Sequence, residues 1–195
     1  MNIKEQLMVR RELWSQLSGM ELAVYLSVQN LCGPYDRTVL IYTSSILYNL
    51  TGEEKDLDSP IKRKKVAEAI ESLIGREIII GRSGNQGSYY IDGLKSFFIH
   101  SKDTDHGFIM INFNNIRKIV QGSSDGREWQ GVLRYYLMLL AHMNKDGECR
   151  YSLQYFSEKI NISELTLSKY NGILKKLGLI KIIRHLKSTS SYLTL

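Results

Sequence analysis

The sequence predicts an α+β fold in which one small unit, made of helices and a β-hairpin, occurs twice. In the C-terminal stretch Tyr151–Leu195, two helical patterns flank a break at Asn161-Ile162 and are followed by a β-rich run, Leu179–Arg184. A polar turn and a last short strand pattern complete this stretch. The segment from Tyr42 to Ile91 shows the same order of patterns. Helix, tight turn, helix and hairpin is the outline of a winged helix-turn-helix. We therefore expect two such units, arranged as an internal pseudo-dimer with central antiparallel β-strands.

The second helix of the C-terminal unit has recognisable ends. Ser163 is a suitable N-cap, because its hydroxyl can accept a hydrogen bond from the first turn, and Gly178 is a suitable stop. Apolar spacing predicts that the helix buries one face, formed by Tyr170, Ile173, Leu174 and Leu177. The opposite, outward face then carries Glu164, Thr166, Ser168, Lys169, Asn171, Lys175 and Lys176.

The N-terminal unit carries similar signals. Ser18 and Glu21 form a capping box that opens an apolar helix, Met20–Leu31. Ser59-Pro60 opens a second helix that is expected to end at Gly75. Two runs around a Gly/Asn turn read as a hairpin, with strands at Glu77–Ile80 and Ser88–Ile91.

The two copies match in sequence pattern as well as in order. Tyr42-Thr-x-x-Ile-Leu47 matches Tyr151-Ser-x-x-Tyr-Phe156, and Val66, Ala69, Ile70 and Leu73 have the spacing of the inward face proposed for the C-terminal helix. A long apolar helix, capped at Asp125, opens the second copy as Met20–Leu31 opens the first. The predicted boundaries are residues 1–95, a central connector at 96–124, and residues 125–195.

The connector is expected to join the halves through a shared sheet. Ser96–Ile99 and Phe108–Ile111 read as strands, and Asn112 is a candidate cap for a short helix, Phe113–Val120. Residues 1–17 read as an amphipathic lead-in whose large apolar side chains pack on the helices that follow.

The positive charge is concentrated in the C-terminal half. The net charge is +6; residues 1–98 hold 12 basic and 12 acidic side chains, and residues 99–195 hold 14 basic and 8 acidic ones. Such a surplus is often only a solvated surface. Here it falls on the unit whose second helix enters the major groove in winged-helix proteins, which favours double-stranded DNA as the partner.

Two stretches carry a family resemblance: Leu17-Ser-Gly-Met-Glu-Leu-Ala-Val-Tyr-Leu26 and Leu174-Lys-Lys-Leu-Gly-Leu-Ile-Lys-Ile182. In these the chain resembles the tandem winged-helix DNA-binding proteins of plasmids and other mobile elements in Gram-positive bacteria. That group includes replication initiators and proteins that recognise transfer origins. The resemblance covers most of the chain at fold level. It implies a role in replication, transfer or transcriptional control without choosing among them.

The expected DNA contacts come from both units. In the C-terminal unit, Thr166, Ser168 and Lys169 are candidates for reading bases, because the N-terminal part of the second helix meets the base edges. Phosphates would be held from the helix end and wing by Lys175, Lys176, Arg184, His185 and Lys187. In the N-terminal unit the candidates are Lys62, Arg63, Lys64 and Lys65, with Arg82 in the wing. Four cations at a helix N-terminus oppose the helix dipole, which suggests a polyanionic partner; nearby carboxylates are the alternative explanation.

Two other function classes remain as alternatives. An enzyme is disfavoured, because the sequence has no nucleophile–base or metal-ligand motif. Cys32 and Cys149 read as buried or half-buried thiols, and no cofactor or metal is expected. A protein-interaction module of a replication or transfer complex would keep the fold without binding DNA. No signal peptide or bilayer-length apolar run is apparent, so the expected location is the cytoplasm. We expect a monomer that acts as an internal dimer on two half-sites about one helical turn apart.

Overall fold

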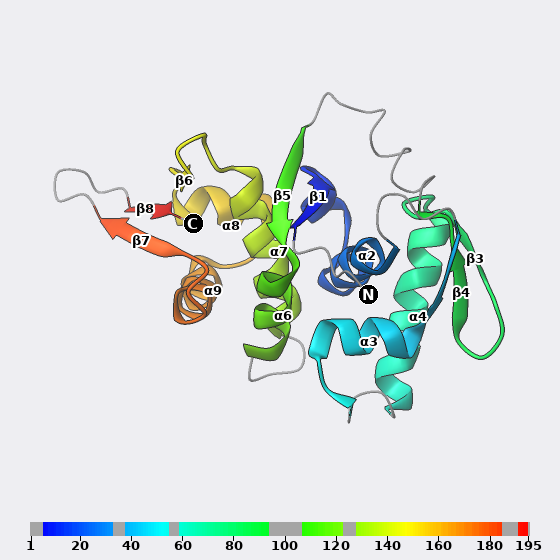
Figure 1. Ribbon diagram of the computed structural model, residues 1–195. Coiled ribbons are helices and arrows are strands. Elements are labelled where there is room, and N and C mark those ends of the chain that lie inside the picture. The colour runs from blue at the N-terminus through cyan, green and yellow to red at the C-terminus, as the bar shows by residue number, and fades with distance from the viewer. Residues whose placement is uncertain are drawn as a thin grey trace.

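The computed structural model describes residues 6–32, 38–54, 59–93, 107–122, 128–184 and 191–194. Within these ranges the protein is α+β, as predicted, and all of its sheets are antiparallel. Figure 1 shows the helices of the first unit on the right and those of the second on the left, with a two-stranded sheet at the upper centre between them.

The first unit alternates helices with a small sheet. Its elements in chain order are α2 (Gly19–Cys32), β2 (Val39–Tyr42), α3 (Thr43–Thr51), α4 (Pro60–Gly75), β3 (Gly81–Ser83) and β4 (Ser88–Ile91). The strands lie in the order β2-β4-β3, so β4, the last strand, is the central one. The predicted cap of α2 is confirmed: the Ser18 amide donates to Glu21 Oε2 at 2.8 Å, and the Glu21 amide donates to Ser18 Oγ at 3.2 Å.

The second unit repeats this arrangement. Its elements are α7 (Glu128–Ala141), β6 (Glu148–Cys149), α8 (Leu153–Ile160), α9 (Glu164–Lys176), β7 (Lys181–Arg184) and β8 (Ser191–Thr194). The strand order β6-β8-β7 again places the last strand in the centre. The two halves therefore share both the order of their elements and the order of strands in their sheets. Asp125, the predicted cap of α7, lies outside the described residues.

The central sheet differs from the predicted one. β5 (Phe108–Asn112) pairs with β1 (Gln6–Arg10), with Met8 opposite Met110. The segment Gln6–Arg10 was predicted as part of a lead-in and is instead a strand, because its partner lies about one hundred residues further along the chain. The other predicted central strand, Ser96–Ile99, lies outside the described residues. After β1 comes the short helix α1 (Leu13–Gln16), and β5 leads into α6 (Phe113–Gly122), with Asn112 Oδ1 accepting from the Asn114 amide as expected.

The two units share one hydrophobic core. α2 packs against α7, and buried side chains of both belong to the same cluster. Gly19 allows this contact, because a Cβ there would overlap the backbone of Gln130 in α7. Both cysteines, Cys32 and Cys149, are buried thiols, as predicted.

A buried polar network ties α6 to the first unit. Arg117 of α6 donates from Nε to the Asn49 carbonyl oxygen at 2.7 Å and from Nη2 to Asn49 Oδ1 at 2.8 Å. Asn49 Nδ2 in turn donates to Ser27 Oγ at 3.0 Å and to Asn30 Oδ1 at 3.2 Å. Asn49 is buried, so its polar atoms depend on these partners.

The hairpin of the first unit begins later than predicted. Glu77–Ile80 is not a strand; it is the turn by which the chain leaves α4, and the first strand starts at Gly81. α4 extends to Gly75 as expected, but the left-handed residue that ends it is Glu77, with φ 56°. Ile78 and Ile79 are buried against the helices, which explains why this apolar run resembled a strand.

The structural alignment of α4 with α9 differs from the predicted alignment by about one helical turn. The Ile78 amide donates to the Leu73 carbonyl, and the Leu179 amide donates to the Leu174 carbonyl, both at 2.9 Å. These equivalent helix ends align Leu73 with Leu174, whereas the sequence interpretation aligned Leu73 with Leu177. That interpretation was wrong because Leu167, which is buried, had been left out of the inward face.

Candidate nucleic-acid interface

α9 presents one face to the core and one to solvent. Ser163 caps it as predicted, since its Oγ accepts from the Thr166 amide at 3.2 Å. Leu167, Asn171 and Leu174 are the buried side chains, with Tyr170 packed at the edge. Asn171 was predicted on the outward face of α9, and this prediction was wrong. Asn171 is 7% exposed, and its Oδ1 accepts a hydrogen bond of 3.0 Å from the Tyr135 hydroxyl.

Most of the predicted contact residues of α9 are on its outer face. Ser168, Lys169, Lys175 and Lys176 are exposed. Thr166 is half-buried, and its hydroxyl lies 2.9 Å from Ser163 Oγ, so it takes part in the helix cap. Lys175 and Lys176 lie in the last turn, where the helix dipole favours positive charge.

Lys169 is held by a carboxylate of the neighbouring helix. Its ammonium group forms an ion pair with Glu128, the first residue of α7. The Glu128 side chain is 10% exposed and that of Lys169 66%, so the pair sits at the edge of the interface between the helices. Next to it, Tyr170 fills the space left by Gly131, where a Cβ would meet the phenol ring. Burial and the Glu128 carboxylate raise the pKa of Tyr170.

The four predicted cations of the first unit are all exposed in the first turns of α4. Ser59 caps this helix by accepting from the Lys62 amide at 3.4 Å, and Pro60 is its first residue, as predicted. Lys62, Arg63, Lys64 and Lys65 follow. The Lys64 ammonium lies 3.9 Å from Glu68 in a highly exposed pair that binds it weakly.

The wing residues are described only in part. Arg82 is exposed on β3, and its guanidinium lies over the Tyr90 ring, 5.2 Å from the centroid. Arg184 is the last residue of β7, and its side chain is outside what the structure describes. Lys187 and His185 also lie outside the described residues.

The two cationic helices flank the same turn of α7. Lys65, Glu68 and Ala69 of α4 line a pocket of about 410 Å³ together with Gln130, and the next residue, Gly131, contacts Tyr170 of α9. In Figure 1, α4 and α9 accordingly lie on opposite sides of the central helices. The structure thus brings the candidates of the two units to either side of one helix end, which sequence spacing alone did not predict.

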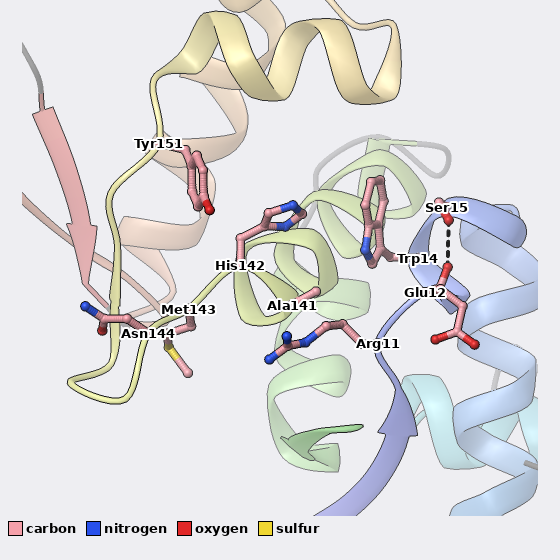
Figure 2. Close-up of a pocket in the computed structure, with 9 residues that line it drawn as sticks. All are labelled: Arg11, Glu12, Trp14, Ser15, Ala141, His142, Met143, Asn144 and Tyr151. Atoms are coloured by element: carbon pink, nitrogen blue, oxygen red, sulfur yellow. Dashed lines mark hydrogen bonds between the residues drawn. The ribbon is translucent and has the colours of Figure 1, made fainter. Parts of the chain in front are cut away.

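Another pocket, of about 500 Å³, lies where α1 meets the end of α7 (Figure 2). His142 is its only imidazole within the described part of the chain, and both ring nitrogens are engaged: Nδ1 lies 2.8 Å from the Met138 carbonyl oxygen and Nε2 3.1 Å from the Tyr155 hydroxyl. Trp14 and Tyr151 pack edge-on against the ring. Ser15 also lines the pocket, and its hydroxyl donates to the backbone carbonyl oxygen of Glu12 at 2.7 Å. These contacts give His142 a packing role between α7 and α8.

The sequence analysis did not predict two exposed apolar side chains on these helices. Leu165 in α9 and Ile61 in α4 are 84% and 69% exposed. Leu165 lies opposite the buried positions Leu167, Asn171 and Leu174, and its exposure would have been predicted if Leu167 had been assigned to the core.

No model of a protein family and no curated protein sequence matches this chain. Among the described residues, no helix is both long and apolar enough to cross a membrane. The same residues hold no group of three or more side chains suited to bind a metal ion.

Proposed function

We propose that this protein is a non-enzymatic, double-stranded DNA-binding protein built from two winged helix-turn-helix units. One observation carries the proposal: the chain contains twice, in the same order, helix, strand, helix, helix and two strands, with a sheet whose last strand is central. In each copy the third helix exposes a face that carries several cations. That element order with an outward third helix is the arrangement that places a recognition helix in the major groove.

In this proposal α9 and α4 are the recognition helices. Ser168 and Lys169 reach base edges, while Thr166, whose hydroxyl serves the cap, contributes less than the sequence suggests. Lys175 and Lys176 contact phosphates beside α9, and Lys62–Lys65 do so beside α4. Arg82, Arg184 and Lys187 belong to the two wings.

The biological setting follows from the family resemblance of the sequence. We infer that the protein serves the transfer or replication of a plasmid or another mobile element, or its transcriptional control, in the bacterial cytoplasm. It would act as a monomer that imitates a dimer, with other proteins of a transfer or replication complex as further partners. The α2–α7 contact supports the monomer, because it joins both units within one core.

DNA titration at two salt concentrations tests the proposal. A phosphate-dominated interface requires that log affinity fall linearly with log salt, with a slope of about −0.9 for each phosphate contacted in duplex DNA. We expect a slope of about −4 or steeper, measured by fluorescence anisotropy of a labelled random duplex. Footprinting on a selected site should show two protected segments on one face, about one helical turn apart. Binding that is absent, or insensitive to salt, would contradict the proposal.

A second candidate function is a protein-interaction module, favoured by the outer face of the first sheet. Leu40 lies opposite Tyr90, both are exposed, and Tyr42 is exposed on the same strand as Leu40. In this case DNA binding would be absent or unaffected by salt. The titration above separates the two functions.

Lys169 gives a residue-level prediction. Lys169→Ala should lose about 1–3 kcal/mol of binding on the selected site and much less on random DNA, because a base contact contributes only where the base is correct. Competition titrations with both DNAs measure this difference. Lys176→Ala, which removes a cation expected to contact phosphate, should weaken both complexes equally. If Lys169→Ala weakens binding to both DNAs equally, Lys169 contacts the DNA phosphate backbone and not a base.

A further inference from the structure

The two most exposed large apolar side chains of the described residues both lie in the first turn of a candidate recognition helix. Leu165 is 84% exposed and Ile61 69%. Each stands two residues after the serine that caps its helix, Ser163 in α9 and Ser59 in α4. A single exposed leucine needs no explanation. An exposed aliphatic side chain in the first turn of both candidate recognition helices does.

The surroundings of these side chains indicate a charged rather than an apolar partner. Ile61 is followed directly by Lys62–Lys65, all exposed. Leu165 shares the outer face of α9 with Lys169, Lys175 and Lys176. An apolar protein surface or a second copy of this chain would have to bury or face these cations at a cost. A duplex offers phosphates to the cations and apolar groups to the two aliphatic side chains.

In the major groove, the apolar group on the base edges is the C5-methyl of thymine. Residues in the N-terminal part of a recognition helix meet these edges. We infer that Leu165 and Ile61 each contact a thymine methyl group, so that they help to set the base sequence that this protein prefers. The inference rests on the proposed function, and it adds two specificity-determining residues that are neither charged nor polar.

Deoxyuridine in place of thymidine tests the inference, because this change removes the methyl and keeps every hydrogen-bonding group of the base. A preferred duplex is first selected from a random library with the full-length protein. It is then remade with each thymidine replaced in turn by deoxyuridine, and affinities are measured by anisotropy. At the contacted positions the unaltered protein should lose about fourfold in affinity, the equivalent of one buried methyl or methylene group.

The variants assign the loss to a side chain. Leu165→Ala should bind the thymidine and deoxyuridine duplexes equally at one contacted position, and Ile61→Ala should do so at another. Both side chains are exposed, so the substitutions leave the core intact. Leu40→Ala, another exposed leucine but on the outer face of the first sheet, should keep the fourfold difference at every position.

The outcomes separate this inference from the proposed function. If the unaltered protein does not bind duplex DNA, the proposed function is wrong and the inference with it. A different outcome is that the protein binds duplex DNA while deoxyuridine substitution changes nothing, or while Leu165→Ala and Ile61→Ala both keep the full thymidine preference. In either case DNA binding stands and the methyl contacts are refuted.

Discussion

Replacing Lys62, Lys64 and Lys65 together by alanine is expected to reduce DNA affinity by one to two orders of magnitude at low salt. All three side chains are exposed in the first turns of α4, and each phosphate contact contributes about 0.9 to the slope of log affinity against log salt. The slope should therefore become shallower by about 2 to 3. Anisotropy titrations at four or more salt concentrations give both quantities. The affinity loss should shrink as salt rises, because the release of each counterion into a more concentrated salt solution gains less free energy.

A variant with the same change in charge provides the control. Lys118, Lys145 and Lys159 are also exposed, and none of them lies on α4, α9 or the strands β3 and β7. Their combined replacement by alanine should lower the affinity only slightly, through the net charge. If the two triple variants weaken binding equally, α4 has no specific role, and the DNA-binding surface of the first unit must be assigned elsewhere.

Arg117→Ala is expected to lower the free energy of unfolding by about 2–4 kcal/mol. The substitution removes two hydrogen bonds to Asn49 and leaves the carbonyl and the side-chain oxygen of that buried residue without them. Urea denaturation followed by circular dichroism measures the change. Because Arg117 links α6 to α3, the loss should appear in the unfolding of the whole molecule rather than as a separate early transition.

Lys118→Ala is the matched control, since Lys118 is the next residue of α6 and is exposed. It should change the stability by less than about 0.5 kcal/mol. A similar loss for both variants would mean that the effect comes from helix propensity or charge. An unchanged stability in Arg117→Ala would show that water replaces the guanidinium at Asn49.

Local signals in the sequence predicted helix ends correctly. Ser18, Ser59 and Ser163 all cap helices, because a serine hydroxyl positioned before an apolar repeat satisfies amides of the first turn. The two-residue strand β6 was not predicted, but the order of the helices in both copies was predictable, since it depends on periodicity and turn residues. β1 was not, because Gln6–Arg10 becomes a strand only through pairing with Phe108–Asn112.

The candidate site was predictable in its charge and less so in its geometry. Exposed lysines follow from composition and helical spacing. The outward face of α9, by contrast, depends on which apolar residues are buried, and the choice of Leu177 in place of Leu167 turned Asn171 to the wrong side. The ion pair of Lys169 with Glu128 joins residues from two helices, and no local pattern encodes it.

The close contact of Gly19 with Gln130 affects which spacing between two DNA half-sites the protein can bind. Because Gly19 has no side chain, the start of α2 lies directly against Gln130 of α7, and the two halves share one hydrophobic core. A dimer of separate subunits can rotate at its interface to follow a longer or shorter operator. If α4 and α9 are the recognition helices, we expect an added base pair between the half-sites, which turns the second half-site by about 34–36° around the axis, to weaken binding. We therefore expect the protein to prefer one spacing between its two half-sites.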